Sequence, residues 1–106
     1  MLALWRRLFP RASNVITLAD LDRAGACYGY LVRFRRLFGR RVVVTEELAV
    51  RYALDFPLGW AATRFLTEEG FRQFCAIKRV SESCDQFTEN RARVFARLLL
   101  THRQNQ

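Results

Sequence analysis

The arginine side chains are the groups in this sequence best suited to recognition chemistry. Five of them fall close together, at Arg33, Arg35, Arg36, Arg40 and Arg41. A guanidinium group presents N–H donors in a planar fork that matches the oxygens of phosphates and carboxylates. The spacing places Arg33, Arg36 and Arg40 along one helical stripe. Arg35 lies on the other flank, and Arg41 lies just beyond the stripe. We predict that these five residues form the binding surface.

The same cluster also fits a solvated helix face whose arginines pair with acidic residues elsewhere in the fold. Arg6, Arg7 and Arg11 extend the surface only if the N-terminal segment packs nearby. Arginine also outnumbers lysine by seventeen to one. A GC-rich genome produces the same bias, so this ratio does not by itself indicate phosphate binding.

Residues suited to catalysis do not form a recognisable set. The single histidine, His102, lies near the C-terminal end and is predicted to be exposed rather than to act as a base. No serine or cysteine has a histidine partner. Gly25 and Gly29 lack the context of a phosphate-binding loop. The acidic pairs Glu46–Glu47 and Glu68–Glu69 fall at predicted helix starts, where the helix dipole explains them. We therefore expect no enzymatic activity, no metal and no cofactor.

The cysteines and the apolar segments bear on the compartment. Cys27, Cys75 and Cys84 are odd in number and contain no C-x-x-C pair, so they predict small buried thiols rather than a disulfide framework or a zinc site. No apolar run is long enough to span a membrane. The apolar stretch before Arg6 is too short for a signal-peptide core. Residues 1–9 are predicted to form two amphipathic turns, and packing of Trp5 onto the domain is favoured over contact with an anionic membrane. The sequence thus predicts a cytoplasmic protein without membrane insertion.

Charge is unevenly distributed along the 106 residues, whose net charge is +8. Residues 1–41 contain nine arginines and two aspartates, whereas residues 42–106 contain nine basic and eight acidic residues. The length suits one domain, and the 51% of hydrophobic residues suits a packed core. Such asymmetry predicts a side that faces a polyanion, which leaves nucleic acid, an anionic membrane surface and an acidic protein surface as candidates.

Helices are the elements that must position these arginines. An apolar stripe at spacings of three and four predicts a helix over residues 26–38, with Gly39 just past its end. Thr17 and Asp20 have the form of a capping box, and they predict a short helix that stops near Gly25. The stripe consists of Cys27, Tyr30, Leu31, Phe34, Leu37 and Phe38.

Beyond Gly39 the sequence predicts further helices and one strand-like piece. Residues 10–16 are expected to be a loop and Val42–Val44 a strand stub or buried connector. Thr45 and Thr67 are good N-caps. One helix is expected to end before Pro57, the next to contain Trp60, and residues 68–103 to form one long helix or two. A line of Cys84, Phe87, Arg91, Val94 and Leu98, with Phe95 and Leu99 beside it, marks the apolar side of the last part.

The fold class predicted is all-α: a compact bundle of five or six helices with at most a short strand-like stub at 42–44. We expect a single domain with an N-terminal segment and loop at 1–16, a helical core at 17–103 and a frayed tail at 104–106, with Arg103 fraying too. Residues 46–66 have the outline of a helix–turn–helix. Their second helix offers only Thr63 and Arg64 to base edges, so this pair is not favoured as a DNA reader.

Four short motifs follow one another along residues 17–100. They are Ala24-Gly-Ala-Cys27, Phe34-Arg-Arg-Leu-Phe-Gly39, Val44-Thr-Glu-Glu-Leu-Ala49 and Gly59-Trp-Ala-Ala62. This succession resembles a group of small phage and prophage proteins with GAC, F-x-x-x-F, V-T-E-x-L-A and W-A-A motifs. Phe56 to Trp60 departs from the group's pattern, which has an aspartate and an additional tryptophan there. The resemblance implies a helical fold and a mobile-element origin, and it supplies no site residues.

Two functions are compatible with these features. The first is a non-enzymatic binding protein whose basic surface contacts nucleic acid or a nucleoprotein complex. The second is a phage-type accessory protein that inhibits a host protein complex by direct binding, for example an anti-CRISPR. The basic charge favours the first hypothesis, and the resemblance favours the second.

Overall fold

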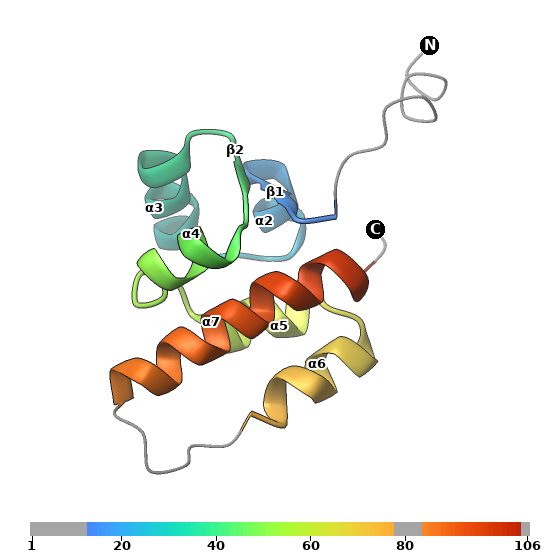
Figure 1. Ribbon diagram of the computed structural model, residues 1–106. Helices are drawn as coiled ribbons and strands as arrows, with labels where there is room; N and C mark the ends of the chain where they lie inside the picture. Colours follow the sequence, from blue (N-terminus) through green and yellow to red (C-terminus); the bar gives the residue numbers. More distant parts are fainter. Residues whose placement is uncertain (1–12, 78–83, 105–106) are drawn as a thin grey trace.

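The computed structural model describes residues 13–77 and 84–104, which form six helices and two short strands (Figure 1). The described part is mostly helical, as predicted. Arg6, Arg7, Arg11 and the predicted amphipathic turns of residues 1–9 lie outside the described residues. None of the helices in the described ranges is long and apolar enough to cross a membrane.

The first helix begins at the predicted capping box. Strand β1 (Val15–Thr17) leads directly into α2 (Leu18–Arg23). The hydroxyl of Thr17 accepts a hydrogen bond from the backbone N–H of Asp20 at 3.0 Å, and the Asp20 carboxylate accepts one from the backbone N–H of Thr17 at 2.9 Å. These two hydrogen bonds give partners to backbone N–H groups that would otherwise lack them at the start of a helix. A turn follows in which Gly25 has a φ of 87°.

Helix α3 (Tyr28–Phe38) follows its predicted span closely and ends at Gly39, whose φ is 77°. The chain then reverses into strand β2 (Arg41–Val43), which pairs antiparallel with β1 so that Ile16 lies opposite Val42. The prediction of a loop over residues 10–16 is therefore wrong for Val15 and Ile16, which belong to β1. The predicted strand-like stub is one of the two strands of this sheet. Local periodicity could not reveal this pairing because its two strands are far apart in the sequence.

The next three helices are α4 (Glu46–Arg51), α5 (Leu58–Phe65) and α6 (Glu68–Cys75). The hydroxyls of Thr45 and Thr67 cap α4 and α6, as predicted. Helix α4 ends earlier than expected, and residues 52–57 form an irregular connection to α5.

Helix α7 (Cys84–Thr101) runs through the middle of the fold, so residues 68–103 contain two helices rather than one (Figure 1). It packs against α4, α5 and α6. Its most buried residues are Ala92, Phe95, Ala96, Leu98 and Leu99. The buried side thus contains the predicted Phe95, Leu98 and Leu99, but it is centred beside the predicted line and extends to Ala92 and Ala96. The guanidinium of Arg91, which belongs to that line, lies over the ring of Phe74 at 4.8 Å.

Arg103 anchors the C-terminal end instead of fraying. Its Nη2 lies 3.4 Å from Oδ2 of Asp20, a carboxylate that is completely buried. Its Nη1 donates to the backbone oxygens of Ser13 at 3.2 Å and Val15 at 3.3 Å, and its guanidinium lies over the ring of Phe65. The backbone N–H of Gln104 also donates a hydrogen bond to the backbone oxygen of Phe65 at 2.8 Å. The end of α7 thus ties β1 and α2 to α5.

Two further predictions about single residues are corrected. His102 is half-buried rather than exposed, because it packs over Gly70 on α6. Cys27 and Cys75 are exposed rather than buried thiols. Cys27 is the residue that precedes α3, and Cys75 ends α6. The side chain of Cys84 lies outside the described part of the chain.

Candidate anion-binding surface

Helix α3 lies at the edge of the molecule and buries one side against the core (Figure 1). Phe34 is buried, while Tyr30 and Phe38 are half-buried around it. The opposite side faces solvent. All five predicted binding residues, Arg33, Arg35, Arg36, Arg40 and Arg41, have exposed side chains.

Three of these arginines meet at a shallow, open groove of about 700 Å³ between α2 and α3. Because α3 ends at Phe38 and the chain turns back at Gly39, Arg40 does not continue the predicted stripe. It lies beside Arg35 and Arg41 instead, and its backbone oxygen accepts a hydrogen bond from the N–H of Leu18 at 2.8 Å. The rest of the groove is formed by Thr17, Leu18, Ala19, Asp22 and Leu31.

Arg33 lies on the other flank of α3. Its Nη1 donates to the backbone oxygen of Asp55 at 2.9 Å, which joins α3 to the connection between α4 and α5. Arg36 projects between the two flanks, because it follows Arg33 by three positions and Arg35 by one on a helix of 3.6 residues per turn. The five arginines therefore surround the outward face of α3 rather than form one row.

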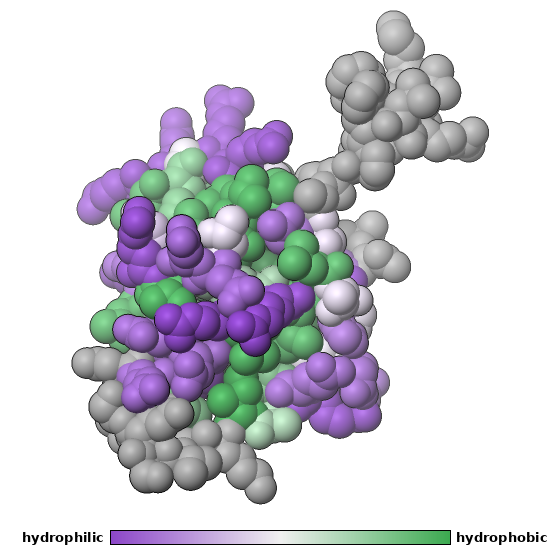
Figure 2. All heavy atoms as spheres, viewed as in Figure 1, coloured by the Kyte–Doolittle hydropathy of each residue, from purple (hydrophilic) through white to green (hydrophobic). Residues whose placement is uncertain are grey.

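The charge of this surface is only partly offset within the described residues, by Asp22 in the groove wall. The sequence has no acidic residue between Asp22 and Glu46, and none of the five arginines forms an ion pair with a carboxylate in residues 13–77 and 84–104. By contrast, Arg72 and Arg97 pair with glutamates on α6 and α4. Hydrophilic side chains extend from the end of the molecule that α3 and β2 form (Figure 2).

Apolar side chains on the outward face of α3 were not anticipated from the sequence. Tyr28 is 81% exposed and Val32 is 37% exposed. They stand one turn apart, and Arg36 follows one turn later. The sequence signal was available, because Tyr28 and Val32 fall outside the apolar stripe of the helix. This face thus combines guanidinium groups with an aromatic ring and a branched aliphatic side chain.

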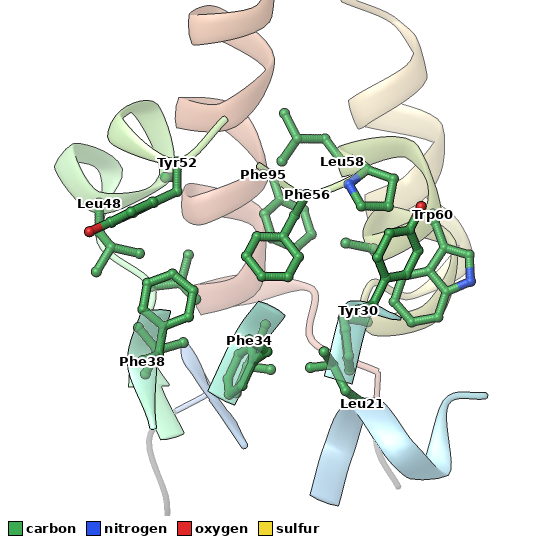
Figure 3. Close-up of a pocket in the computed structure, with 17 residues that line it drawn as sticks. Leu21, Tyr30, Phe34, Phe38, Leu48, Tyr52, Phe56, Leu58, Trp60 and Phe95 are labelled. Carbon is green, nitrogen blue, oxygen red and sulfur yellow. The ribbon is translucent and has the colours of Figure 1, made fainter. Parts of the chain in front are cut away.

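A second feature is an apolar pocket under α3, with a volume of about 90 Å³ (Figure 3). Eight of its seventeen lining residues are aromatic, and two of them, Phe38 and Phe56, stack with ring centroids 5.9 Å apart. Tyr30 and Trp60 lie against each other at another part of the wall, with ring centroids 6.1 Å apart. Sites for small molecules usually enclose roughly 300 to 1,000 Å³ and contain a few polar groups, so this pocket belongs to the core.

No family model, no curated protein and no solved structure matches this chain. Within the described residues, no group of three histidine, cysteine, aspartate or glutamate side chains is placed to hold a metal ion. The outward face of α3 and the adjoining groove are the features from which a function can be inferred.

Proposed function

We propose that the protein acts in the cytoplasm by binding nucleic acid, alone or in a nucleoprotein complex, without catalysing a reaction. Arg33, Arg35, Arg36, Arg40 and Arg41 are the residues that contact phosphate groups in this proposal. The observation that carries it is the exposure of these guanidinium groups without an acidic partner in the described residues. Exposed arginines at this density attract a polyanion and bind its phosphates with two parallel hydrogen bonds.

The groove adds a shape to this charge. Arg35 comes from α3, whereas Arg40 and Arg41 come from the turn and from β2, so their guanidinium groups approach one groove from different elements. The backbone hydrogen bond between Leu18 and Arg40 fixes this turn against α2. Asp22 is the acidic residue of the groove wall, and it offsets part of the positive charge there.

The test is fluorescence anisotropy with labelled DNA and RNA, single-stranded and duplex, at low and at physiological salt. The informative variant replaces Arg35, Arg40 and Arg41 with glutamine. The control replaces Arg51, Arg64 and Arg72 with glutamine, which removes the same charge from exposed positions on α4, α5 and α6. Binding that depends steeply on salt, that the first variant weakens and that the control retains is expected. Equal effects of both variants would contradict a localised site.

A protein partner is the second candidate, in which the chain inhibits a host protein complex by direct binding, as an anti-CRISPR does. The observation that favours it is the exposure of Tyr28 beside Val32 and Arg36. Tyrosine and arginine are enriched among the residues that dominate protein interfaces. This candidate predicts no binding to free nucleic acid at low salt and a stable complex with an acidic protein surface, which Tyr28→Ala weakens.

A further inference from the structure

We propose that α2, the turn after it and α3 form a helix–turn–helix unit that places the outward face of α3 in the major groove of duplex DNA. The inference rests on the proposed function, and it names duplex DNA as the ligand. It also moves the helix–turn–helix from residues 46–66, where sequence alone suggested its outline, to residues 18–38.

The connection between the two helices has the required form. Four residues, Ala24 to Cys27, join α2 to α3, and Gly25 takes the positive φ of 87° that the turn needs. The turn is held by the backbone N–H of Ala26, which donates to the oxygen of Leu21 at 3.0 Å. Helix-turn-helix motifs join their helices by a turn of three or four residues that often contains glycine. Helix α2 also packs against α3.

The outward face of α3 has the size and composition of a reading face. Tyr28 and Val32 lie one above the other on the helix, and Arg36, assigned above to a phosphate, follows one turn beyond them. Gly29 stands beside Tyr28, and a Cβ built there would meet nothing closer than the sulfur of Cys27 at 3.9 Å. A groove wall can therefore approach the backbone closely at this position. A helix about 10 to 12 Å across fits a major groove about 12 Å wide.

The positive charge lies on both sides of this face. Arg33 stands on one flank, and Arg35, Arg40 and Arg41 stand on the other, where they line the groove beside α2. Arg33 uses Nη1 for the Asp55 oxygen, and its guanidinium has further donors. Tyr28 and Val32 separate the two flanks with uncharged atoms. This is the pattern that two phosphate backbones with base edges between them require, because phosphate contacts position a protein and base contacts specify sequence.

Other nucleic acids match this arrangement less well. The major groove of duplex RNA is deep and narrow, so side chains do not reach its bases. A single strand has one phosphate backbone, so it would contact the arginines on only one side of the outward face of α3. From Tyr28 to Arg36 the helix rises about 12 Å, which corresponds to a footprint of about four base pairs.

The experiment selects binding sites from a random 30-base-pair DNA library with the full chain. The selected duplex is then compared by anisotropy with its single strands and with duplex RNA of the same sequence. An enriched motif of about four base pairs and binding of duplex DNA about tenfold tighter than of the other forms are expected. Tyr28→Ala combined with Val32→Ala should weaken the selected duplex about tenfold and random duplex less than twofold, because such contacts discriminate between bases.

Leu100→Ala serves as the control, because Leu100 is 59% exposed on α7 and lies outside the reading face. Circular dichroism confirms that each variant remains folded. Equal or tighter binding of single strands or of duplex RNA, or the lack of an enriched motif, overturns the helix–turn–helix inference and leaves nucleic-acid binding intact. Failure to bind any of these nucleic acids at low salt overturns both.

Discussion

Replacing Arg103 with leucine is predicted to destabilise the protein strongly, although the residue lies next to the C-terminal end. The Arg103 side chain is 11% exposed, and its partner Asp20 is completely buried. The substitution removes an ion pair, two hydrogen bonds to the backbone oxygens of Ser13 and Val15, and the stacking on Phe65. Breaking a buried pair from one side costs about 3 to 5 kcal/mol, because a charge remains buried without its partner.

The lower end of that range applies here. Asp20 keeps the guanidinium of Arg23 and the backbone N–H of Thr17 as partners after the substitution. The distance of 3.4 Å in the Asp20–Arg103 pair is also longer than that of an optimal charge-assisted hydrogen bond. We therefore expect a loss of about 3 kcal/mol in the free energy of unfolding. With a urea m-value of about 1.5 kcal/mol/M, the unfolding midpoint should fall by about 2 M.

The assay is urea denaturation followed by circular dichroism. Arg72→Leu is the matched control, because Arg72 pairs with Glu68 and Glu69 on the surface of α6. Exposed pairs of this kind contribute about 1 kcal/mol or less. If Arg103→Leu changed the stability no more than Arg72→Leu does, the assignment of Arg103 as the anchor between β1, α2 and α5 would be refuted.

Three further predictions concern stability and binding. Gly70→Ala should destabilise the fold by about 1 to 3 kcal/mol, because the added Cβ would lie 2.6 Å from Cβ of His102. Gly29→Ala should stabilise the fold by about 0.5 kcal/mol, because its Cβ meets only the sulfur of Cys27 at an ordinary contact distance of 3.9 Å. Thermal unfolding of both variants checks the opposite signs. Thr17→Ala should lower the free energy of unfolding by about 1 kcal/mol, measured by urea denaturation, because α2 loses its N-terminal cap. An unchanged free energy of unfolding would show that the hydrogen bond between Thr17 and Asp20 does not stabilise the fold. If Arg33, Arg35, Arg36, Arg40 and Arg41 each contact one phosphate, log affinity for duplex DNA should fall with log salt at a slope of about −4.5. Glutamine at Arg35, Arg40 and Arg41 should reduce that slope to about −1.8, and titration at four salt concentrations measures both.

Local sequence patterns were sufficient to predict several elements. Thr17, Thr45 and Thr67 have hydroxyls that cap a helix within three residues, so their role depends only on near neighbours. The span of α3 followed from its apolar stripe and from Gly39 for the same reason. Helix α3 presents Arg33, Arg35 and Arg36, and all five arginines are exposed, but the predicted stripe does not extend to Arg40, because α3 ends before it.

Features that depend on distant residues were not predicted. Val15 and Ile16 form a strand because β2 pairs with them after two helices have intervened. Arg103 is anchored because Asp20, 83 positions away, is buried beneath it. The position of Arg40 depends on the chain reversal at Gly39 and on the hydrogen bond to Leu18. No spacing rule within a single helix contains this information.

We propose that the outward face of α3 and its flanking arginines bind nucleic acid. The most direct test is the anisotropy of a labelled 30-base-pair DNA duplex titrated at low salt with three proteins. These are the unaltered chain, the Arg35/Arg40/Arg41→Gln variant and the Arg51/Arg64/Arg72→Gln control. Saturable binding by the unaltered chain and the control, weakened at least tenfold in the first variant, is the predicted result. No binding by the unaltered chain, or equal loss in both variants, would contradict the claim.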